Sequence, residues 1–516
     1  MKFSKITLAV ATIFSTGVPF CACAMELYMD TKTAQIYAQP GPDRKFMGVF
    51  EKTPDDQIKP EVMGVRKNSA LMAREVIAAQ GHTADANQVS TKLGEKGLEI
   101  ETRDGDFKIG IGGRLQLDGQ INNNGNNISQ SAKLDNGADV RRGRIHMDGT
   151  LYKDYDFKFE YDFVRGSGTT AAGITDAWVE YTGIQPVTFT VGQFKEPFSL
   201  ESVTSNRFLT FVERSSANNA FVEFANPYLM GISAQTYGKR YTVRGAFQAE
   251  PIGNGNYPNN TSLNSNGNAN RNNQSGNPSY GFTGRATFLP IYNSKTELLH
   301  LGIAGSHRIV NNTSNGISAM SFASQVANVD RTNWANTGGL TDPVSVLVNR
   351  RVLENFSRVG VEVAGVYGPF SLQAEYMRTQ LNGQNYDSRD HLDGYYIYAS
   401  YFLTGESRNY DTKKGAFGRQ NPNNNFSLKN GGSGAWELAA RFDSLDMNTA
   451  HVSGGSLQNG TLAVNWYINP HVRLMTDYTH VFTNKTEYTG FTKVAPALAT
   501  SGQHPGIFML RAQVDW

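Results

Sequence analysis

The sequence predicts an all-β protein, a transmembrane antiparallel β-barrel of about 16 strands with a mostly non-barrel N-terminal leader. Three observations predict this fold. Short segments alternate strictly between apolar and polar residues, an export signal opens the chain, and no later stretch approaches the roughly 18 to 20 apolar residues that a membrane helix needs. In lipid only helices and closed barrels satisfy every backbone N–H and C=O group, so an exported chain of this pattern can cross a membrane only with strands.

The alternation is clearest around residues 156–163, where every second side chain is aromatic: Phe157, Phe159, Tyr161 and Phe163. The side chains between them are charged, so one face of this strand suits lipid and the other suits water. The last ten residues, 507–516, repeat the pattern. A half-buried strand of a soluble sheet alternates in the same way, so the number of segments and their context must decide between the two folds.

The first 24 residues have the pattern of a cleaved secretory signal peptide. Lys2 and Lys5 precede an apolar run that ends at Phe20, and Ala22-Cys23-Ala24 supplies the small-x-small sequence of a cleavage site. A lipoprotein signal is the alternative, but the proline and phenylalanine before Cys21 fit a lipidation site poorly. Both cysteines of the chain lie in this peptide, so the mature protein has no disulfide and no thiolate ligand.

Residues 25–105 are expected to form a leader, either periplasmic or associated with the pore. This segment contains Pro40, Pro54 and Pro60, mixed charges and a short helix-like stretch at 69–79, and it is too polar and too broken to belong to a barrel. The alternation starts at Phe107. We therefore place the barrel at residues 106–516.

Sixteen candidate strands follow, an even number, as single-chain bacterial barrels require. They are 107–120, 139–153, 156–164, 173–182, 186–194, 228–237, 240–249, 280–289, 297–308, 356–367, 370–378, 394–403, 435–443, 459–468, 472–482 and 507–516. Tight turns such as Gly238-Lys239 and Gly368-Pro369 contrast with long polar loops at 253–278, 309–355 and 404–434. Short turns on one rim and long outward-facing loops on the other are typical of outer-membrane barrels, as is the C-terminal aromatic Trp516.

The face opposite the lipid-facing side chains lines the lumen, and it carries charges of both signs. Its basic residues are Lys108, Arg114, Arg142, Arg144, His146, Lys158, Arg244, Arg285, Arg358, Arg441, Arg473 and Arg511. Its acidic residues are Asp118, Asp148, Glu160, Asp162, Glu180, Glu362, Glu375, Glu437, Asp477 and Asp515. Cross-strand ion pairs that hold the wall are one explanation for these arginines. A basic track is the other, because guanidinium groups bind phosphate bidentately.

Overall charge does not favour a nucleic-acid partner. The chain has 48 basic and 46 acidic residues, and cleavage of the signal peptide would remove two lysines and no acid, which leaves a formal charge of zero. The neutral balance also leaves the degree of anion selectivity open.

Three stretches of this sequence resemble the phosphate-selective porins O and P: Gly112–Asp118, Arg141–Phe163 and Asp176–Arg214. The resemblance covers about residues 107–231. It implies a homotrimeric 16-stranded porin in the outer membrane of a Gram-negative bacterium, with lipid, further copies of itself and small anionic or polar solutes as its partners. It also implies that the third loop, here about residues 194–228, folds into the lumen.

Carried over to this chain, the family's basic constriction falls on Arg114, on Arg141 or Arg142, and on Lys195. Arg141 shares the parity of the lipid-facing Ile145, so Arg142 is the better candidate unless the strand is irregular. The full set of candidate anion-binding or constriction residues is Arg114, Arg142, Arg144, Lys195, Arg207 and Arg214. The expected function is passive diffusion of small hydrophilic solutes, anions such as phosphate among them, through a water-filled channel.

Other functions have weaker support in the sequence. An enzyme would need a catalytic constellation, but His146 with Asp148 is only a fragment of one, and no GxSxG-like elbow is present. The nine histidines lack ligand spacing, so we expect no catalytic residues, no metal and no cofactor. The alternative function is a surface adhesin or structural barrel acting through its long loops, although asparagine-rich loops are more often a solvated shield.

Overall fold

The computed structural model describes residues 25–30, 36–37, 41–50, 89–94, 97–124, 133–164, 173–223, 227–249, 280–310, 320–341, 350–485 and 501–516. The chain divides into two units, residues 1–85 and 86–516. The expected signal peptide, the helix-like stretch at 69–79 and the loop at 253–278 lie outside the described residues. Among the described residues, no helix has the length and apolar character needed to cross a membrane.

The first unit contains a small antiparallel sheet with the strand order β2–β1–β3. Its strands are β1 (Met25–Asp30), β2 (Ile36–Tyr37) and β3 (Arg44–Phe50). This sheet belongs to the segment that the sequence places in the leader.

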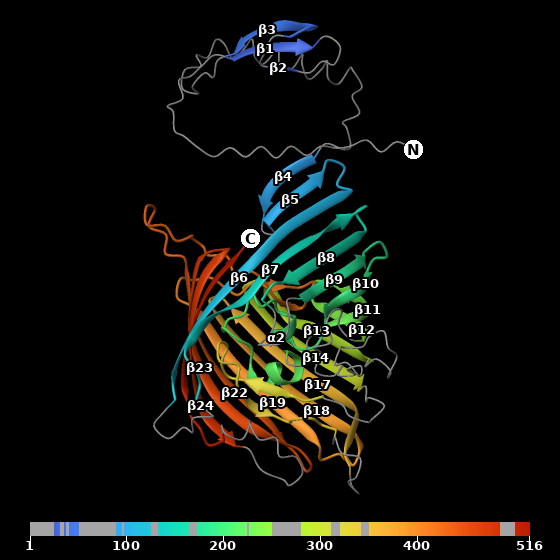
Figure 1. Cartoon of the computed structure of the whole chain (residues 1–516), viewed down its shortest axis with the longest axis vertical. Helices are drawn as coiled ribbons and strands as arrows, with labels where there is room; N and C mark the ends of the chain where they lie inside the picture. Colours follow the sequence, from blue (N-terminus) through green and yellow to red (C-terminus); the bar gives the residue numbers. More distant parts are fainter. Residues whose placement is uncertain are drawn as a thin grey trace, which may run out of the picture. The chain divides into compact units, whose positions relative to one another are not determined.

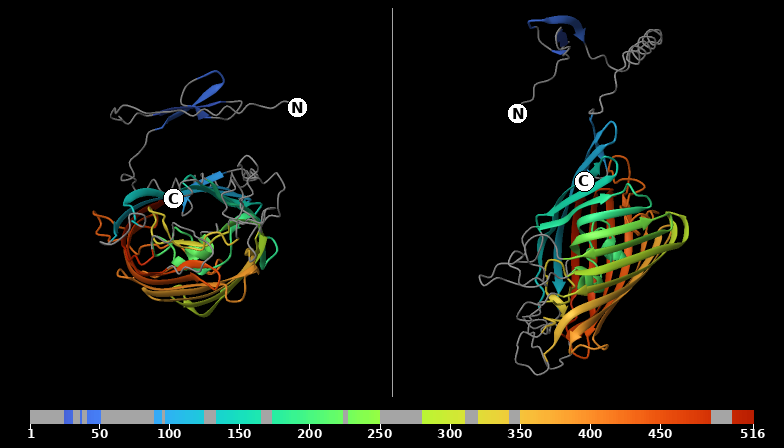
Figure 2. Two further views of the ribbon diagram at one scale, coloured as in Figure 1. Left: turned by 60° about the horizontal axis from the view of Figure 1, so that its bottom comes forward. Right: turned by 90° about the vertical axis from the view of Figure 1, so that its right-hand side faces the viewer.

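The second unit is built around a closed antiparallel barrel of sixteen strands (Figures 1 and 2). In chain order these are β6 (Phe107–Asn123), β7 (Gly137–Leu151), β8 (Tyr155–Asp162), β9 (Gly173–Tyr181), β10 (Val187–Lys195), β11 (Tyr228–Tyr237), β12 (Tyr241–Gln248), β13 (Tyr280–Ser294), β14 (Glu297–Ile309), β17 (Val352–Tyr367), β18 (Phe370–Gln384), β19 (His391–Phe402), β22 (Ala435–Asn448), β23 (Ser453–Asn469), β24 (Val472–Lys485) and β25 (Gly506–Asp515). The last strand pairs with the first from Gly506↔Asn123 to Asp515↔Arg114, which closes the sheet. The predicted fold is therefore confirmed.

The outward faces of the strands carry the expected apolar side chains. On β25, Phe508, Leu510 and Val514 are exposed and the alternate residues are buried; on β8, Phe159 is exposed while Glu160 and Asp162 are buried. Charged side chains are therefore buried on the inside and apolar side chains are exposed on the outside. This distribution is the reverse of that in a soluble protein and is typical of a barrel in lipid.

The two ends of the barrel differ in their connections. We call one end the turn rim, where the short connections 152–154, 182–186, 238–240, 295–296, 368–369 and 470–471 lie, and the other the loop rim. The segment 403–434 joins β19 to β22 and therefore lies on the turn rim. The prediction that residues 404–434 form one of the long outward-facing loops was wrong. This segment follows the twelfth barrel strand, and the short turns also follow even-numbered barrel strands.

A short hairpin precedes the first barrel strand and extends its sheet. It consists of β4 (Val89–Gly94) and β5 (Gly97–Thr102), and β5 pairs with β6 from Leu98↔Ile111 to Glu101↔Lys108. The backbone of Trp516 pairs with Gly113 just beyond, at 2.9 and 3.1 Å. The hairpin thus continues the edge of β6 where the C-terminal strand ends, although its residues lie within the range 25–105 that the sequence places outside the barrel.

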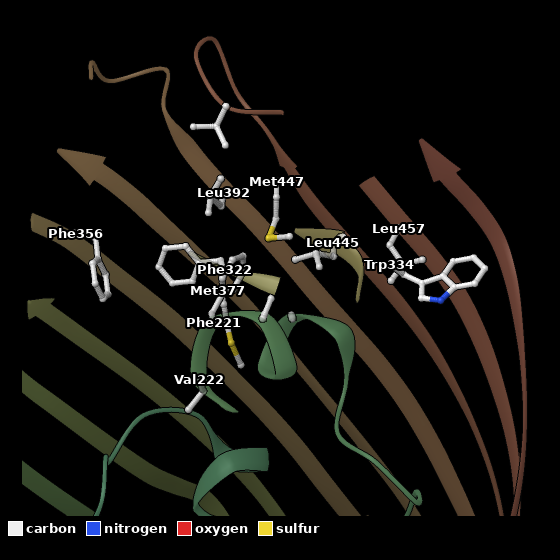
Figure 3. Packing of buried hydrophobic residues seen from close by; sticks show 14 of the residues in the cluster. Phe221, Val222, Phe322, Trp334, Phe356, Met377, Leu392, Leu445, Met447 and Leu457 are labelled. Carbon is white, nitrogen blue, oxygen red and sulfur yellow. The ribbon is translucent and has the colours of Figure 1, made fainter. Parts of the chain in front are cut away.

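The interior near the loop rim is apolar rather than polar. Inward side chains of β18, β19, β22 and β23, among them Met377, Leu392, Leu445 and Leu457, are buried in one hydrophobic cluster (Figure 3). They pack against segments that enter the barrel, so the lumen wall there has the character of a protein core. Alternation in the strands does not indicate this, because the packing partners are far away in sequence.

Candidate functional site

The segment between β10 and β11 lies inside the barrel and is tied to the opposite wall. It contains α2 (Leu200–Val203), α3 (Ser216–Asn218) and the π-helical turn η2 (Asn219–Glu223). We call the described residues of this segment, 196–223 and 227, the inward loop; the sequence predicted it at about 194–228. Wall carboxylates accept hydrogen bonds from its backbone: Glu375 from Leu200 N at 3.0 Å and Glu201 N at 2.7 Å, Asp477 from Val212 N at 2.8 Å, and Asp443 from Ser216 N at 3.1 Å. These hydrogen bonds fix the loop across the lumen to β18, β22 and β24.

A second segment from the loop rim packs on the inward loop. Residues 320–341 carry β15 (Ala323–Gln325) and β16 (Asn333–Asn336). Phe322 stands edge-on to Phe221 of the inward loop and to Phe356 of β17, with ring centroids 6.0 and 5.4 Å apart. Trp334 is fully buried in the same cluster (Figure 3). Apolar packing therefore holds both segments in place within the lumen.

The segment 403–434 enters from the turn rim. Its β20 (Tyr410–Asp411) and β21 (Ala416–Phe417) bury Tyr410 and Phe417 against Leu200 of α2. Arg285 of β13 donates to the carbonyl oxygen of Gly415 at 2.8 Å while it pairs with Glu362 at 2.7 Å. The lumen is thus narrowed from both ends.

Most wall arginines are held by carboxylates. Arg511 donates to both oxygens of Asp118 at 2.7 Å, and Arg441 donates to Asp443 at 2.8 Å. The bidentate Arg511–Asp118 pair joins β25 to β6 and the Arg441–Asp443 pair lies within β22, and both leave little charge for a passing ion.

Two of the six predicted site residues share one buried glutamate. Arg114 contacts Glu160 and also Asn206 of the inward loop. Arg144 contacts Glu160 at 2.9 Å and Asp162 at 2.7 Å. All four charged side chains are buried, so this cluster connects the wall to the loop and is already neutralised.

Arg142 reaches the loop from β7, and so does Arg141. Arg142 lies 3.3 Å and Arg141 3.1 Å from the same carboxylate, that of Glu213. The pairing of β6 with β7 jumps from Gln116↔Arg142 to Leu117↔Val140, so Arg141 is the extra residue of a bulge. A bulge interrupts the two-residue period, which is why Arg141, assigned by parity to the lipid-facing side, reaches the same carboxylate as the preferred Arg142.

Lys195 and Arg214 fold the loop onto itself. Lys195 Nζ donates to the carbonyl oxygen of Ser202 at 2.6 Å, and Arg214 donates to those of Glu201 at 3.0 Å and Thr204 at 2.9 Å. Both cations also face Glu223, at 3.6 and 3.1 Å. Although burial raises the pKa of Glu223, Arg214 and Lys195 lower it to about 2, so this carboxylate stays charged at neutral pH.

Arg207 differs from the other five. Its guanidinium donates no hydrogen bond to any described residue, and its nearest carboxylate oxygen is Asp515 Oδ2 at 4.0 Å from Nε. It lies over the ring of Phe208, 5.4 Å from the centroid, and Arg419 lies over the same ring at the same distance. Burial, and then the neighbouring Arg114, lower the pKa of Arg207 to about 10, so this group carries a positive charge at neutral pH.

Arg207 opens into a cavity near the turn rim, which we call the turn-rim cavity. It is lined by Arg207, Phe208, Arg419, Gln420, Tyr467, Asn469, Pro470, His471, Val472, Arg473, Gln513 and Asp515. With His471 neutral, three arginines face one aspartate, a formal charge of +2. Arg419 holds Asp515 at 2.7 Å, and Nε of Arg473 has no hydrogen-bond partner. The sequence did not identify Arg419 as a candidate site residue, because residues 404–434 were predicted to be an outward-facing loop on the loop rim.

A second cavity lies further along the same wall toward the loop rim. It is lined by Arg141, Glu213, Arg214, Ser216, Asn219, Gln325, Val326, Ala327, Asn328, Arg441, Asn459, Asp477, Thr479 and Met509. Between the two cavities the inward loop contacts the wall, where Arg473 donates to Leu209 O at 2.8 Å and Asp477 accepts from Val212 N at 2.8 Å. The stretch 209–212 of the loop therefore separates them along β24 and β25.

One group of potential metal ligands is present in the described part of the chain. Asp387, Asp390 and His451 lie on the loop rim with ligand atoms within 4.8 Å of one another. Their contacts are already structural, because Asp387 pairs with Arg389 at 2.7 Å and Asp390 accepts from His451 and Thr449 at 2.8 and 2.7 Å.

The architecture and the charged, loop-narrowed lumen are those of a channel, and the comparison with known families decides its type. A family model described as "Phosphate-selective porin O and P" matches residues 109–516. The chain belongs to this porin family. Family membership makes the chain an outer-membrane porin channel, and it confirms the resemblance seen in the sequence.

Individual relatives of this porin are distant. Porin O of Pseudomonas aeruginosa is 28% identical over 430 residues, which cover 78% of this chain and 89% of that protein. An uncharacterized protein of Caulobacter vibrioides is 28% identical over 413 residues, 79% of this chain and 75% of that protein. Among solved structures, a loop-deletion mutant of OmpT from Vibrio cholerae and an anion-selective porin from Comamonas acidovorans both have a TM-score of 0.45, with 8% and 11% identity, and cover 80% of this chain and 100% of their own.

Proposed function

We propose that this porin prefers anions, phosphate among them, and passes small hydrophilic solutes by passive diffusion. The observation that carries the proposal is the guanidinium of Arg207, which donates no hydrogen bond to a described residue and lies 4.0 Å from the carboxylate of Asp515, in a cavity with a formal charge of +2. The other five predicted cations are bound to carboxylates or carbonyl oxygens. An anion entering the lumen therefore meets uncompensated positive charge in the turn-rim cavity.

The chemistry of the turn-rim cavity suits an oxyanion. Guanidinium groups offer planar pairs of N–H donors that match phosphate oxygens, and they remain protonated at the pH of any natural surroundings. Arg207, Arg419 and Arg473 reach this cavity from three different segments of the chain. Donors from several directions can replace part of an anion's hydration shell, while the single aspartate reduces the attraction enough for the ion to leave.

The narrowing of the lumen brings solutes to this cavity. The inward loop, residues 320–341 and the segment 403–434 occupy much of the interior, so a solute passes close to charged walls rather than along a wide aqueous path. Fields are focused where low-dielectric walls surround one sign of charge, which raises the local concentration of the counter-ion.

We also propose, from the family resemblance and the export pattern, that the mature chain is a homotrimer in the outer membrane after cleavage at Ala24. Chemical cross-linking of the folded protein in membranes, followed by mass determination, tests the trimer. Bands that stop at the monomer would contradict it. The N-terminal sequence of the exported protein tests the cleavage site.

Efflux from proteoliposomes tests the solute preference. Vesicles that contain the folded porin are loaded with phosphate or with an organic cation of similar size. We expect phosphate to leave faster at low ionic strength and the difference to shrink in high salt, because screening weakens attraction to the arginines. Equal rates for both ions at low salt would contradict the proposed preference.

A further inference from the structure

A small hairpin projects from the outside of the barrel at the turn rim. Residues Phe426–Gly434, the rim hairpin, form the last part of the segment 403–434 and are closed by a bridge between Ser427 and Gly432. Phe426 N donates to Ile468 O at 2.8 Å, which joins the hairpin to β23. In Figures 1 and 2 the orange segment that stands out from the barrel wall belongs to this part of the chain. While residues 410–417 turn into the lumen, the rim hairpin turns out.

The base of the rim hairpin rests on two stacked tryptophans. Trp436 of β22 and Trp466 of β23 lie 5.2 Å apart with an interplanar angle of 15°. They share the parity of the exposed Leu438 and Val464, so both indoles are on the lipid-facing side. Their Nε1 atoms both donate to the carbonyl oxygen of Ser433, at 3.2 and 2.9 Å. The hairpin is therefore fastened to the lipid-facing surface and does not hang free from the rim.

The rim hairpin exposes an apolar side chain at its base, Phe426, and another at its tip, Leu428. Leu428 is 91% exposed, and Phe426, whose ring meets Trp466 edge-on at 4.9 Å, is 37% exposed. Lys429 follows directly and is also exposed. An aromatic residue, an aliphatic residue and a lysine at the edge of an aromatic belt are the side chains that suit the boundary between acyl chains and headgroups.

We propose that the rim hairpin is a membrane-surface anchor that inserts Phe426 and Leu428 into the phospholipid leaflet next to the turn rim, with Lys429 at the lipid phosphates. Lipid is the partner because the apolar side chains of the hairpin extend the lipid-facing surface of β22 and β23. The short turns of outer-membrane barrels face the periplasm, and the leaflet on the periplasmic side of the outer membrane is phospholipid. The anchor also fixes the outer end of the segment that supplies Arg419 to the turn-rim cavity. It does not depend on the proposed anion preference.

The mature chain can be labelled at a single introduced cysteine, because both cysteines of the full sequence lie in the expected signal peptide. A Leu428→Cys variant is labelled with a polarity-sensitive fluorophore and placed in phosphatidylethanolamine–phosphatidylglycerol vesicles. Lys239→Cys, in a short turn on the same rim, is the matched control. Resistance to unfolding by detergent at room temperature confirms that each labelled barrel is folded. We expect blue-shifted emission at position 428, quenched by lipids that carry a quencher near the headgroup, and water-like emission quenched by iodide at position 239.

Two results would overturn the proposal. Water-like emission at position 428, quenched by iodide and not by lipid, would leave the tip in the aqueous phase. Blue-shifted emission that lipid quenchers do not change, together with cross-linking of the two labelled positions between subunits, would instead make the tip a contact between copies. As a second test, Leu428→Asp is expected to lower the unfolding temperature in vesicles but not in detergent micelles, and an equal effect in both would also contradict the anchor.

Discussion

Replacement of Arg207 by glutamine should weaken phosphate binding in the channel, because this guanidinium donates no hydrogen bond to a described residue and its nearest carboxylate, that of Asp515, is 4.0 Å away. The distance from Arg207 Nε to Asp515 Oδ2, 4.0 Å, is a measure of how closely an oxyanion could approach. At about 4 Å, two unit charges attract by roughly 1 kcal/mol in bulk water and roughly 4 kcal/mol at an effective dielectric constant of about 20. Because the cavity opens into a wet lumen, we take the lower part of this range, about 1.4 kcal/mol, which is tenfold in affinity.

The assay is the phosphate concentration that halves the single-channel current at about 0.1 M chloride, where the screening length is about 10 Å. We expect this concentration to rise about tenfold in Arg207→Gln. Arg389→Gln is the matched control, since Arg389 lies on the loop rim, is 71% exposed and pairs with Asp387; it should leave the value unchanged. An unchanged value in Arg207→Gln, with a large change in Arg144→Gln, would refute the reasoning, because it would place the anion at the paired arginines.

Three further predictions concern the same lumen. Arg419→Gln should also raise the half-blocking phosphate concentration, and an effect fully additive with that of Arg207→Gln would show that the two arginines do not share one bound ion. Trp334→Ala should destabilise the core between the inward loop and residues 320–341 by about 3–5 kcal/mol. We expect increased noise in the open-channel current and faster proteolysis within 320–341. Noise equal to that of the wild type would contradict the role of Trp334 in packing these segments together. Anion preference should fall as the pH rises through about 10, because the lowered pKa of Arg207 lets this guanidinium lose its charge there; an anion preference that is the same at pH 8 and pH 11 would contradict a role for Arg207.

The barrel was predictable because its determinants are local. Alternation in windows such as 156–163 reflects a wall with lipid on one side and water on the other, and antiparallel strands joined in chain order need no further information. Most errors at the strand ends fall on the loop rim: β18 runs to Gln384, whereas alternation suggested an end at 378. Near this rim the inward residues pack on loops, so they include apolar side chains such as Met377 and Leu381 that blur the pattern.

The rim of the segment 403–434 was also predictable, although it was assigned wrongly. It follows the twelfth barrel strand, and every connection after an even-numbered strand lies on the turn rim. Length and polarity suggested an outward-facing loop, but strand parity is the stronger physical constraint, because an antiparallel chain returns to the same end after every second strand.

The candidate site was predictable only in composition. Basic residues on the lumen side could be recognised, but whether each is neutralised depends on partners far away, as with Arg511 and Asp118, which are 393 residues apart. The bulge at Arg141 and the isolation of Arg207 arise from register and loop packing, which no local pattern records. Arg207 could be separated from Arg214, seven residues further on in the same loop, only in three dimensions.

The most direct test of the central claim is the reversal potential of the refolded mature protein in a planar bilayer with a salt gradient, measured before and after addition of phosphate. We expect discrete conductance steps, a reversal potential on the anion side, and a current that phosphate blocks in a saturable way. Steps with a cation-side reversal potential, or a current that phosphate does not block, would contradict an anion-preferring lumen centred on Arg207.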